Sequence, residues 1–342
     1  MPQELIAERP GTAELRAYTE RELKPEEIRL ESIFSSVKHG TEFRTFNGDS
    51  ADMSSKWDSQ LRLHSRGQVA ADTFPKSLGN MCLARVSAIG DRVDSLSLGD
   101  LVFGHFPIRQ THTTLPEKVI LKPPGISASG LMYWDPADFA VGGIRDGQVR
   151  LGDRVAVFGL GAIGQMLVQA AKISGARWVV GVDPIERRCR AAVRHGVDLV
   201  LDPGRVDVGV EIKTATGDTG VDVSVEASGS SLAFNDALRA TKYQGTIVST
   251  AYYNEPMEGL LLSGEWHRNR IQVISSRACS EPLVDWGWDF ERVQSESLAL
   301  LTEGRLVADD LIDPVVAFED VAQAYSEVVA HPERSIKLGI QH

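Results

Sequence analysis

A glycine triplet between a short apolar strand and a helix constrains the fold of this chain more than any other feature. Residues 155–158 form the apolar run expected of a buried strand, and G-x-G-x-x-G follows directly, before a predicted helix at 165–173. In such a turn the first glycine allows the sharp exit from the strand, the second admits a pyrophosphate, and the third lets helix and strand pack closely. The first N–H groups of the helix then face the phosphates. The residues expected to bind a dinucleotide here are Gly159, Leu160, Gly161, Ala162, Ile163 and Gly164.

A second predicted strand ends in an acidic residue. Residues 178–182 are apolar, and Asp183 follows them about 20 residues after the glycines, where an acid would hold the ribose hydroxyls. A carboxylate in that position repels a 2′-phosphate, which favours NAD over NADP. Arg187 and Arg188 qualify this preference, because a nearby arginine attracts a phosphate. The alternatives are a solvated helix face for these arginines and a glycine-rich turn without a ligand.

The composition sets limits on the class of protein. The chain has 342 residues, enough for two domains, with 42% hydrophobic and 24% charged residues. Its net charge of −11 disfavours binding to nucleic acids or anionic membranes, because phosphate contacts need clustered Lys and Arg. We expect no signal peptide, no membrane span and a cytoplasmic location. The three cysteines are Cys82, Cys189 and Cys279. They are far apart in sequence and show no C-x-x-C pair, which argues against a disulfide framework or a cysteine-rich zinc lobe.

The pattern of apolar runs predicts two domains. Residues 1–125 are predicted to be β-rich, with a long polar loop and some helix at 45–75, and Pro-Pro-Gly at 123–125 marks a boundary. From 126 onward strands and helices alternate, which predicts a parallel sheet with helices on both faces. After about 275 the chain is expected to return to the first domain. The predicted strands are 28–33, 81–89, 101–106, 155–158, 178–182, 199–201, 221–225, 246–250 and 336–340, and the predicted helices are 129–144 (interrupted at 135–136), 164–174, 184–196, 231–241, 288–302 and 318–331.

With these residues placed, the chain resembles the medium-chain dehydrogenase/reductase superfamily over nearly its whole length. The motifs that carry the resemblance are His-Gly-Thr-Glu at 39–42, the segments 86–93 and 98–104, the strand and turn at 151–164, and the segments 303–305 and 318–325. The resemblance is strongest to the alcohol dehydrogenase-like branch that includes bacteriochlorophyllide dehydrogenase relatives. It implies an α/β fold with a Rossmann domain at 126–274 and a GroES-like catalytic domain at 1–125 completed by 275–342. It also implies a homodimer formed through the cofactor domains, often by joining sheet edges.

The residues at the family's zinc positions differ from the zinc-dependent members. Those members use a Cys, a Gly-His-Glu and a further acidic or Cys ligand. Here His39 takes the Cys position, Asn80 and Met81 follow Gly79 where His and Glu would stand, and Asp135 lies near the third position. Asn is a poor zinc ligand and Met a very weak one. Because two ligands are too few for a tight site, we expect no catalytic zinc.

Without a metal, side chains must handle the proton while the nicotinamide carries the hydride. His39 titrates near neutral pH and is the main candidate for general acid/base catalysis. The resemblance assigns a proton-relaying hydroxyl to Thr41. Glu42 and Lys38 flank it, and Asp135 is placed to orient His39 or share its proton. The alternatives are an ion pair of Glu42 with a nearby arginine, a solvated Lys38, and a packing role for His39.

Further candidates follow the predicted strands. Ser228 and Thr250 lie at the C-terminal ends of two predicted strands, where ligands bind in such folds. Arg188 matches a position of the resembled family that contacts the adenosine ribose. Ser275 and Ser276 resemble the loop that approaches the nicotinamide carboxamide. Candidate substrate contacts are Asn80, His267 and Arg268, the last two with a domain-interface role as the equal alternative.

The combined prediction is an NAD-dependent, zinc-independent dehydrogenase that reversibly oxidises a secondary alcohol to a ketone. A polyol, sugar or cyclitol is the expected small-molecule substrate, by family analogy. Two alternatives remain open. One is an NADPH-dependent quinone or enone reductase, against which Asp183 argues. The other is a dinucleotide-binding protein without catalytic activity.

Overall fold

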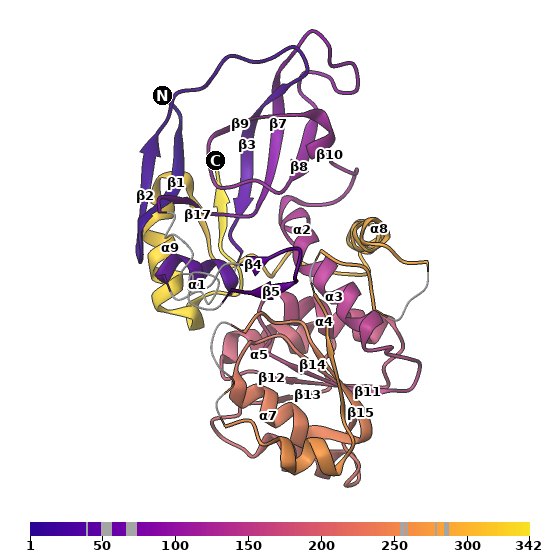
Figure 1. Ribbon diagram of the computed structural model, residues 1–342. Helices are drawn as coiled ribbons and strands as arrows, with labels where there is room; N and C mark the ends of the chain where they lie inside the picture. Colours follow the sequence, from indigo (N-terminus) through magenta and orange to yellow (C-terminus); the bar gives the residue numbers. More distant parts are fainter. Residues whose placement is uncertain are drawn as a thin grey trace. The chain divides into compact units, whose positions relative to one another are not determined.

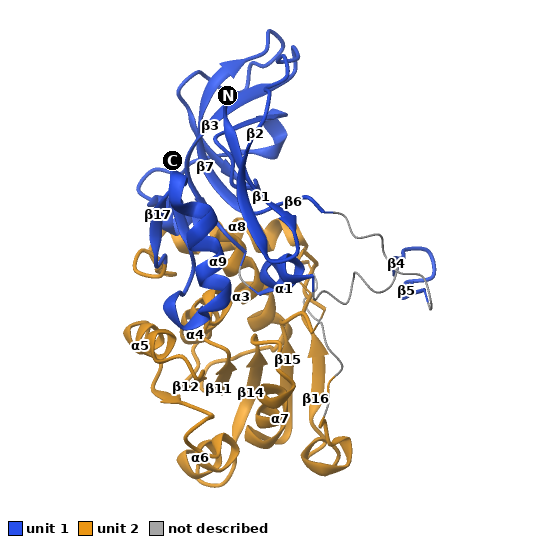
Figure 2. Ribbon diagram, turned by 90° about the vertical axis from the view of Figure 1, so that its left-hand side faces the viewer, with its two compact units in different colours: residues 1–132, 312–342 blue, residues 133–311 orange. Residues whose placement is uncertain are grey.

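The computed structural model describes residues 1–38, 40–48, 57–65, 74–253, 257, 259–277, 279–283 and 287–342. The chain forms two compact units (Figures 1 and 2). Unit 1 comprises Met1–Met132 and Ile312–His342, and unit 2 comprises Tyr133–Leu311. The fold class expected from the sequence, a Rossmann-type α/β unit and a β-rich unit, is confirmed. None of the helices in these described residues is long and apolar enough to cross a membrane.

The chain returns to unit 1 at Ile312, later than the expected position of 275. The reason is the packing of α8 (Phe290–Thr302) on α3 (Trp134–Asp146) within unit 2. Trp134 Nε1 donates to the carbonyl of Gln294 at 3.0 Å. The described residues between 275 and 311 therefore belong to unit 2.

Unit 2 is built on a six-stranded parallel sheet in the order β13-β12-β11-β14-β15-β16. The order reverses between β11 and β14, which makes the carboxyl end of this strand pair a topological switch point. Phe158, the last residue of β11, pairs with Glu226, the last residue of β14. The strands are β11 (Arg154–Phe158), β12 (Trp178–Val182), β13 (Leu199–Leu201), β14 (Val221–Glu226), β15 (Thr241–Ser249) and β16 (Gln272–Ser275).

Helices cover both faces of this sheet, as the alternating pattern predicts. Side chains from α6 and α7 share one buried cluster with Phe158 and Ile247. On the other face α3 packs against α4 and lies close to Val248. Both layers are needed because the central strands carry buried apolar side chains on both of their faces. The remaining helices of unit 2 are α4 (Ala162–Ile173), α5 (Glu186–Arg194), α6 (Val208–Ala215), α7 (Ser231–Ala240) and the π-helical turn η3 (Leu262–Trp266).

The helix expected at 129–144 differs from the prediction in the position of its interruption. The chain forms α2 (Ala128–Met132) and α3, and the break falls at Tyr133. Pro136 lies in the first turn of α3, where a missing N–H breaks no intrahelical hydrogen bond. Pro136 therefore lies inside α3, at the position where the sequence pattern predicts an interruption of the helix.

Unit 1 contains a larger sheet with the path β10-β8-β7-β3-β18-β17, in which β9 also pairs with β3. A second sheet has the order β2-β1-β6. Ile340 in β18 pairs with Ser35 in β3, so the end of the chain completes the N-terminal sheet. The elements are β1 (Gln3–Arg9), β2 (Thr12–Ala17), β3 (Ile28–Ser36), α1 (Thr41–Asn47), β4 (Trp57–Asp58), β5 (Leu63–His64), β6 (Lys76–Ser77), β7 (Met81–Ile89), β8 (Leu101–Gly104), β9 (Thr111–Thr114), η2 (Pro116–Lys118), β10 (Ile120–Leu121), β17 (Val315–Ala317), η4 (Phe318–Asp320), α9 (Val321–Ala330), η5 (Pro332–Arg334) and β18 (Gly339–Gln341).

Candidate functional site

The three glycines of the turn have different surroundings. Gly159 has a φ of +87°, and a Cβ built on it would lie 2.8 Å from the backbone N of Ser228. A Cβ on Gly164 would lie 1.9 Å from the carbonyl O of Gly159. A Cβ on Gly161 would meet no protein atom within 4 Å. The outer two glycines are therefore required by packing, whereas Gly161 leaves open space next to the start of α4.

That open space fits a pyrophosphate. Gly161 is the N-cap of α4 and has no side chain to accept a hydrogen bond from the first N–H groups of the helix. Those groups have no acceptor inside the helix either, and the helix dipole favours a negative charge at this end. The residues predicted to bind the dinucleotide thus form a turn whose geometry suits it.

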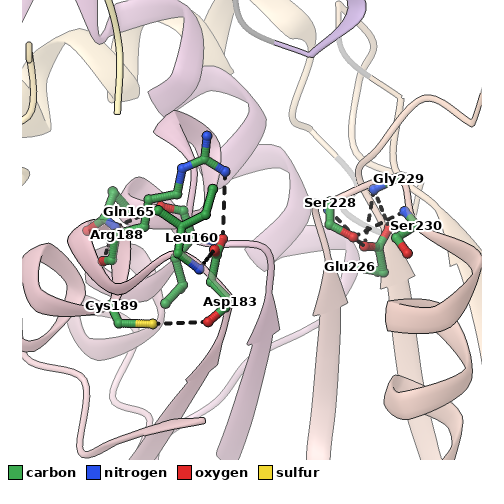
Figure 3. Close-up of polar contacts among 10 residues, drawn as sticks. Leu160, Gln165, Asp183, Arg188, Cys189, Glu226, Ser228, Gly229 and Ser230 are labelled. Atoms are coloured by element: carbon green, nitrogen blue, oxygen red, sulfur yellow. Dashed lines mark hydrogen bonds and ion pairs between the residues drawn. The ribbon is translucent and has the colours of Figure 1, made fainter. Parts of the chain in front are cut away.

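Asp183 lies beside this turn, at the carboxyl end of β12 (Figure 3). Its Oδ2 accepts from the backbone N of Leu160 at 2.8 Å, and its Oδ1 accepts from the backbone N of Ile185 at 2.8 Å. Arg188 Nη1 is 3.8 Å from Oδ2. The side chain is 3% exposed. Because each carboxylate oxygen has two lone pairs, both oxygens can still accept from a ribose hydroxyl.

Gln165 supports the same region and is a residue that the sequence analysis missed. Its Nε2 donates to the carbonyl of Leu160 at 2.8 Å and to the carbonyl of Arg188 at 2.9 Å (Figure 3). The side chain therefore joins the glycine turn to α5. A glutamine after the third glycine has no pattern of its own, so the sequence offers no signal for this role.

Glu226, on the other side of the switch point, is a second missed residue. Its carboxylate accepts from the backbone N of Ser228 at 2.8 Å, from the backbone N of Gly229 at 3.2 Å, and from the hydroxyl of Ser228 (Figure 3). It also accepts from the hydroxyl of Tyr253. The backbone N and Oγ1 of Thr250 donate to the carbonyl of Glu226 at 2.9 and 3.0 Å. The available signal was an acid as the last residue of an apolar strand, as at Asp183.

The other candidates at this edge of the sheet lie at strand ends. Ser275 is the exposed last residue of β16, and the N of Ser276 donates to the carbonyl of Ser249 at 2.8 Å. Ser228, Thr250, Ser275 and Ser276 thus all follow or end strands on the edge that carries Asp183. Their contacts with a cofactor stay predictions.

The structure places His267 and Arg268 away from the strand ends that carry Asp183, and their substrate contacts stay predictions. Both residues precede β16, and Asn269 accepts a hydrogen bond from the N of Gln244 in the first half of β15 at 2.7 Å. Because all strands of this sheet are parallel, the two side chains lie at its amino edge, opposite the edge of Asp183. The chain crosses the length of the sheet between residues 268 and 275, so residues that are close in sequence lie at opposite edges of the sheet.

In unit 1 the carboxylate of Glu42 accepts hydrogen bonds from other parts of the unit. Its Oε1 accepts from the Tyr325 hydroxyl at 2.9 Å, and its Oε2 accepts from the N of Gly79 at 2.9 Å. It forms no ion pair with Arg44 in the described residues. Glu42 therefore connects α1 with α9 and with the loop before Asn80, which is the geometry of a positioning residue.

The remaining catalytic candidates are distributed over both units. Thr41 is the exposed first residue of α1, and Asp135 is buried in the first turn of α3 in unit 2. Asn80 Oδ1 is 3.4 Å from Nδ1 of His105, a histidine without a predicted role. His39 lies outside the described residues. Its acid/base role and its contact with Asp135 therefore stay predictions.

A cavity of about 240 Å³ adjoins α1 in unit 1. Its polar lining combines two cations, one carboxylate and three hydroxyls, and it comprises Lys38, Thr41, Glu42, Thr45, Lys76 and Ser77.

The donor set does not fit a zinc ion. Within the described ranges no three or more His, Cys, Asp or Glu side chains come together as a metal site. Asn80 stands where a histidine ligand would be needed, and the described cysteines are single. Zinc independence was expected from the sequence and stays a prediction, because His39 is not described.

The surroundings of Glu42 predict a dependence of stability on pH. Burial raises the pKa of Glu42 from 4.5 to about 7, against the opposing effect of the hydrogen bonds from Tyr325 and Gly79. The folded state then binds more protons than the unfolded state between these two values, so stability falls as the pH rises through this window. We expect the wild type to lose on the order of 2 kcal/mol relative to Glu42→Gln between pH 5 and pH 8. Urea unfolding of both proteins across this range measures the difference.

A second variant tests the cause. Tyr325→Phe removes a donor that favours the charged carboxylate, so it should steepen the pH dependence. An identical slope for the wild type and Glu42→Gln would show that Glu42 titrates normally in the folded state.

Comparisons with known proteins agree with this geometry. Residues 162–293 match the family described as zinc-binding dehydrogenase, a segment that contains none of the positions discussed for zinc. The chain is 40% identical over 347 residues to D-guloside 3-dehydrogenase from Escherichia coli K12, covering 99% of each chain. It is 26% identical over 281 residues to (R,R)-butanediol dehydrogenase from Bacillus subtilis 168, covering 74% of this chain and 77% of the relative.

Solved structures show the same fold. The 2R,3R-butanediol dehydrogenase from Bacillus subtilis superimposes with a TM-score of 0.79 at 18% identity and covers 100% of both chains. Given the similarity to D-guloside 3-dehydrogenase along nearly the whole chain, this protein belongs to the medium-chain dehydrogenase/reductase superfamily and is an oxidoreductase of the alcohol dehydrogenase-like kind.

Proposed function

We propose that this protein is an NAD-dependent, zinc-independent dehydrogenase that reversibly oxidises a secondary hydroxyl of a sugar, glycoside or related polyol to a ketone. The observation that carries the cofactor proposal is the Asp183 carboxylate, which accepts from the N of Leu160 beside the open turn at Gly161. The substrate class rests on the relative whose name specifies oxidation of a D-guloside at position 3. A sugar with free ring hydroxyls is therefore the first substrate to test.

Residues in different parts of the chain have different proposed roles. The turn and the start of α4 bind the pyrophosphate, and Asp183 orients the adenosine ribose. A bound nicotinamide supplies the hydride acceptor. His39 exchanges the proton of the substrate hydroxyl, Thr41 relays it, and Glu42 holds this segment in place through Tyr325 and Gly79.

One assay separates this proposal from its alternatives. Nicotinamide fluorescence is followed with purified protein, NAD or NADP, and a panel of glycosides, polyols and enones. We expect NAD reduction with a glycoside or polyol, and a loss of about 100-fold or more in kcat for His39→Ala with cofactor binding retained. Reduction of enones with NADPH would favour the reductase alternative. Cofactor binding without turnover of any compound would favour the non-catalytic alternative.

Zinc independence has a direct test. We expect elemental analysis of the purified protein to find well under one zinc per chain, and activity to survive treatment with a chelator. One zinc per chain, removed together with the activity, would contradict the proposal.

We also propose a homodimer formed through unit 2. The strand β16 lies at one edge of the six-stranded sheet and exposes Val273 to 43%, and Leu261 before it is 65% exposed. An uncovered edge strand with apolar side chains is a template for pairing with a second copy.

Light scattering should give twice 37.3 kDa, and Val273→Lys should weaken the dimer. Leu151→Lys, at a leucine 89% exposed in a turn of the same unit, is the control that should leave it intact. A wild-type mass of one chain would contradict this proposal.

A further inference from the structure

Glu226 is a buried acid at the switch point of the unit 2 sheet. Its side chain is fully buried, at 0% exposed. It pairs in register with Phe158, the residue before Gly159, and a Cβ on Gly159 would lie 2.8 Å from the N of Ser228. The loop after β14 therefore packs directly against the glycine turn. Glu226 stands beside the crevice in which a dinucleotide crosses such a sheet.

The groups around the Glu226 carboxylate are donors. Two backbone N–H groups, of Ser228 and Gly229, and two hydroxyls, of Ser228 and Tyr253, point at its oxygens. Four donors satisfy a carboxylate ion, whereas a neutral carboxyl group would turn its own O–H toward them. In the part of the chain that is described, no Lys or Arg lies within ion-pair distance of these oxygens. These donors favour the negatively charged form of Glu226, against the burial that raises its pKa.

The position of this charge matters because the two coenzyme forms differ in charge. The oxidised nicotinamide ring carries a positive charge and the reduced ring carries none. In the doubly wound fold the adenosine half lies toward β12, where Asp183 is, so the nicotinamide half lies toward β14. A charge in a water-excluded site acts more strongly on a neighbouring charge than it would in water.

We propose that the Glu226 carboxylate raises the affinity of this protein for oxidised coenzyme relative to reduced coenzyme. This inference rests on the proposed nicotinamide binding and adds a role for a residue outside the predicted site. The hydrogen bonds of Glu226 also fix the Ser228–Gly229 backbone, so the carboxylate has a structural effect that the experiment must separate from the effect of its charge.

Two substitutions make that separation. Glu226→Gln removes the charge and places an amide NH₂ group opposite the N–H and O–H donors that surround the carboxylate. Glu226→Asp shortens the side chain but keeps the charge. Both disturb the loop. The dissociation constants of NAD and NADH are measured by calorimetry for the wild type and both variants, without substrate, and thermal unfolding reports the effect on folding.

The ratio of the two constants decides the outcome. We expect the ratio Kd(NAD)/Kd(NADH) to rise about tenfold in Glu226→Gln and to stay within about twofold of the wild type in Glu226→Asp. An unchanged ratio in both variants, or an equal rise in both, would overturn the charge-based role. If the wild type bound neither coenzyme, the proposed function itself would fail, which is a distinguishable result.

A measurement on the wild type covers the case in which Glu226→Gln does not fold. Burial raises the pKa of Glu226, with Ser228 and Tyr253 opposing it, so lowering the pH removes the charge at a higher pH than for an exposed glutamate. The titratable neighbour that contacts it, Tyr253, has its own pKa raised by burial and stays neutral. The ratio Kd(NAD)/Kd(NADH) should therefore rise as the pH falls from neutral toward 4.5, the ordinary value for a glutamate. A constant ratio over this range would overturn the inference.

Discussion

Gly161→Ala should abolish coenzyme binding while leaving the protein folded. A methyl group at this position meets no protein atom within 4 Å, and Gly161 has a φ of −69° that alanine also adopts. The same methyl group would fill the open space beside the first N–H groups of α4, where the pyrophosphate is proposed to bind. We expect the dissociation constant of NADH to rise by about 100-fold or more, which corresponds to about 2.7 kcal/mol. Fluorescence titration measures it.

The matched control is Gly164→Ala, which adds the same methyl group three residues later. Its Cβ would lie 1.9 Å from the carbonyl O of Gly159, so the helix must move away from the strand. We expect a loss of about 3 kcal/mol in the free energy of unfolding, well beyond the helix-propensity gain of alanine. The pair should therefore separate binding from folding. A Gly161→Ala protein that binds NADH as the wild type does would show that the turn does not hold the pyrophosphate.

The sequence predicted unit 2 more accurately than unit 1. The bounds of the strands at 178–182 and 199–201 were predicted to the residue, because a buried parallel strand is a short continuous apolar run between polar turns. In unit 1 the strands β1 and β2 were not predicted. Their sequences mix charged and apolar residues, and their burial depends on partners far away in the chain, such as α9. β1 and β2 pair with each other, but the packing that buries them comes from distant segments and leaves little signal in a local window.

The candidate site shows the same contrast. The glycines and Asp183 could be placed because each has a role set by the local strand-turn-helix geometry. Glu226 and Gln165 were missed because their roles depend on which loops the fold brings together. Proximity in sequence was also misleading: His267 lies eight residues before Ser275 and at the opposite edge of the sheet. At this sheet, the position of a residue at a strand end therefore indicates a binding role better than its distance along the chain from a motif.

Asp183→Ala should remove most of the preference for NAD over NADP. In the wild type the carboxylate is buried at the end of β12, where the ribose is proposed to bind, and it would repel a 2′-phosphate. We expect kcat/KM to favour NAD by about 100-fold or more in the wild type and by about tenfold or less in the variant. The comparison uses the ratio of the two coenzymes, because Asp183→Ala also leaves the N–H groups of Leu160 and Ile185 without their acceptor and lowers stability by about 1–3 kcal/mol.

Arg188 and Arg190 provide the matched pair that tests the cause. Arg188 is 3.8 Å from the Asp183 carboxylate, and its charge can attract a 2′-phosphate once the aspartate is removed. The double variant Asp183→Ala with Arg188→Ala should therefore use NADP less well than Asp183→Ala alone. Arg190 carries the same charge on the same helix but pairs with Glu186 at 2.6 Å on the exposed face. Asp183→Ala with Arg190→Ala should therefore behave as Asp183→Ala alone. Equal effects of the two arginine substitutions would mean that the general charge of α5, and not the contact at the end of β12, selects the coenzyme.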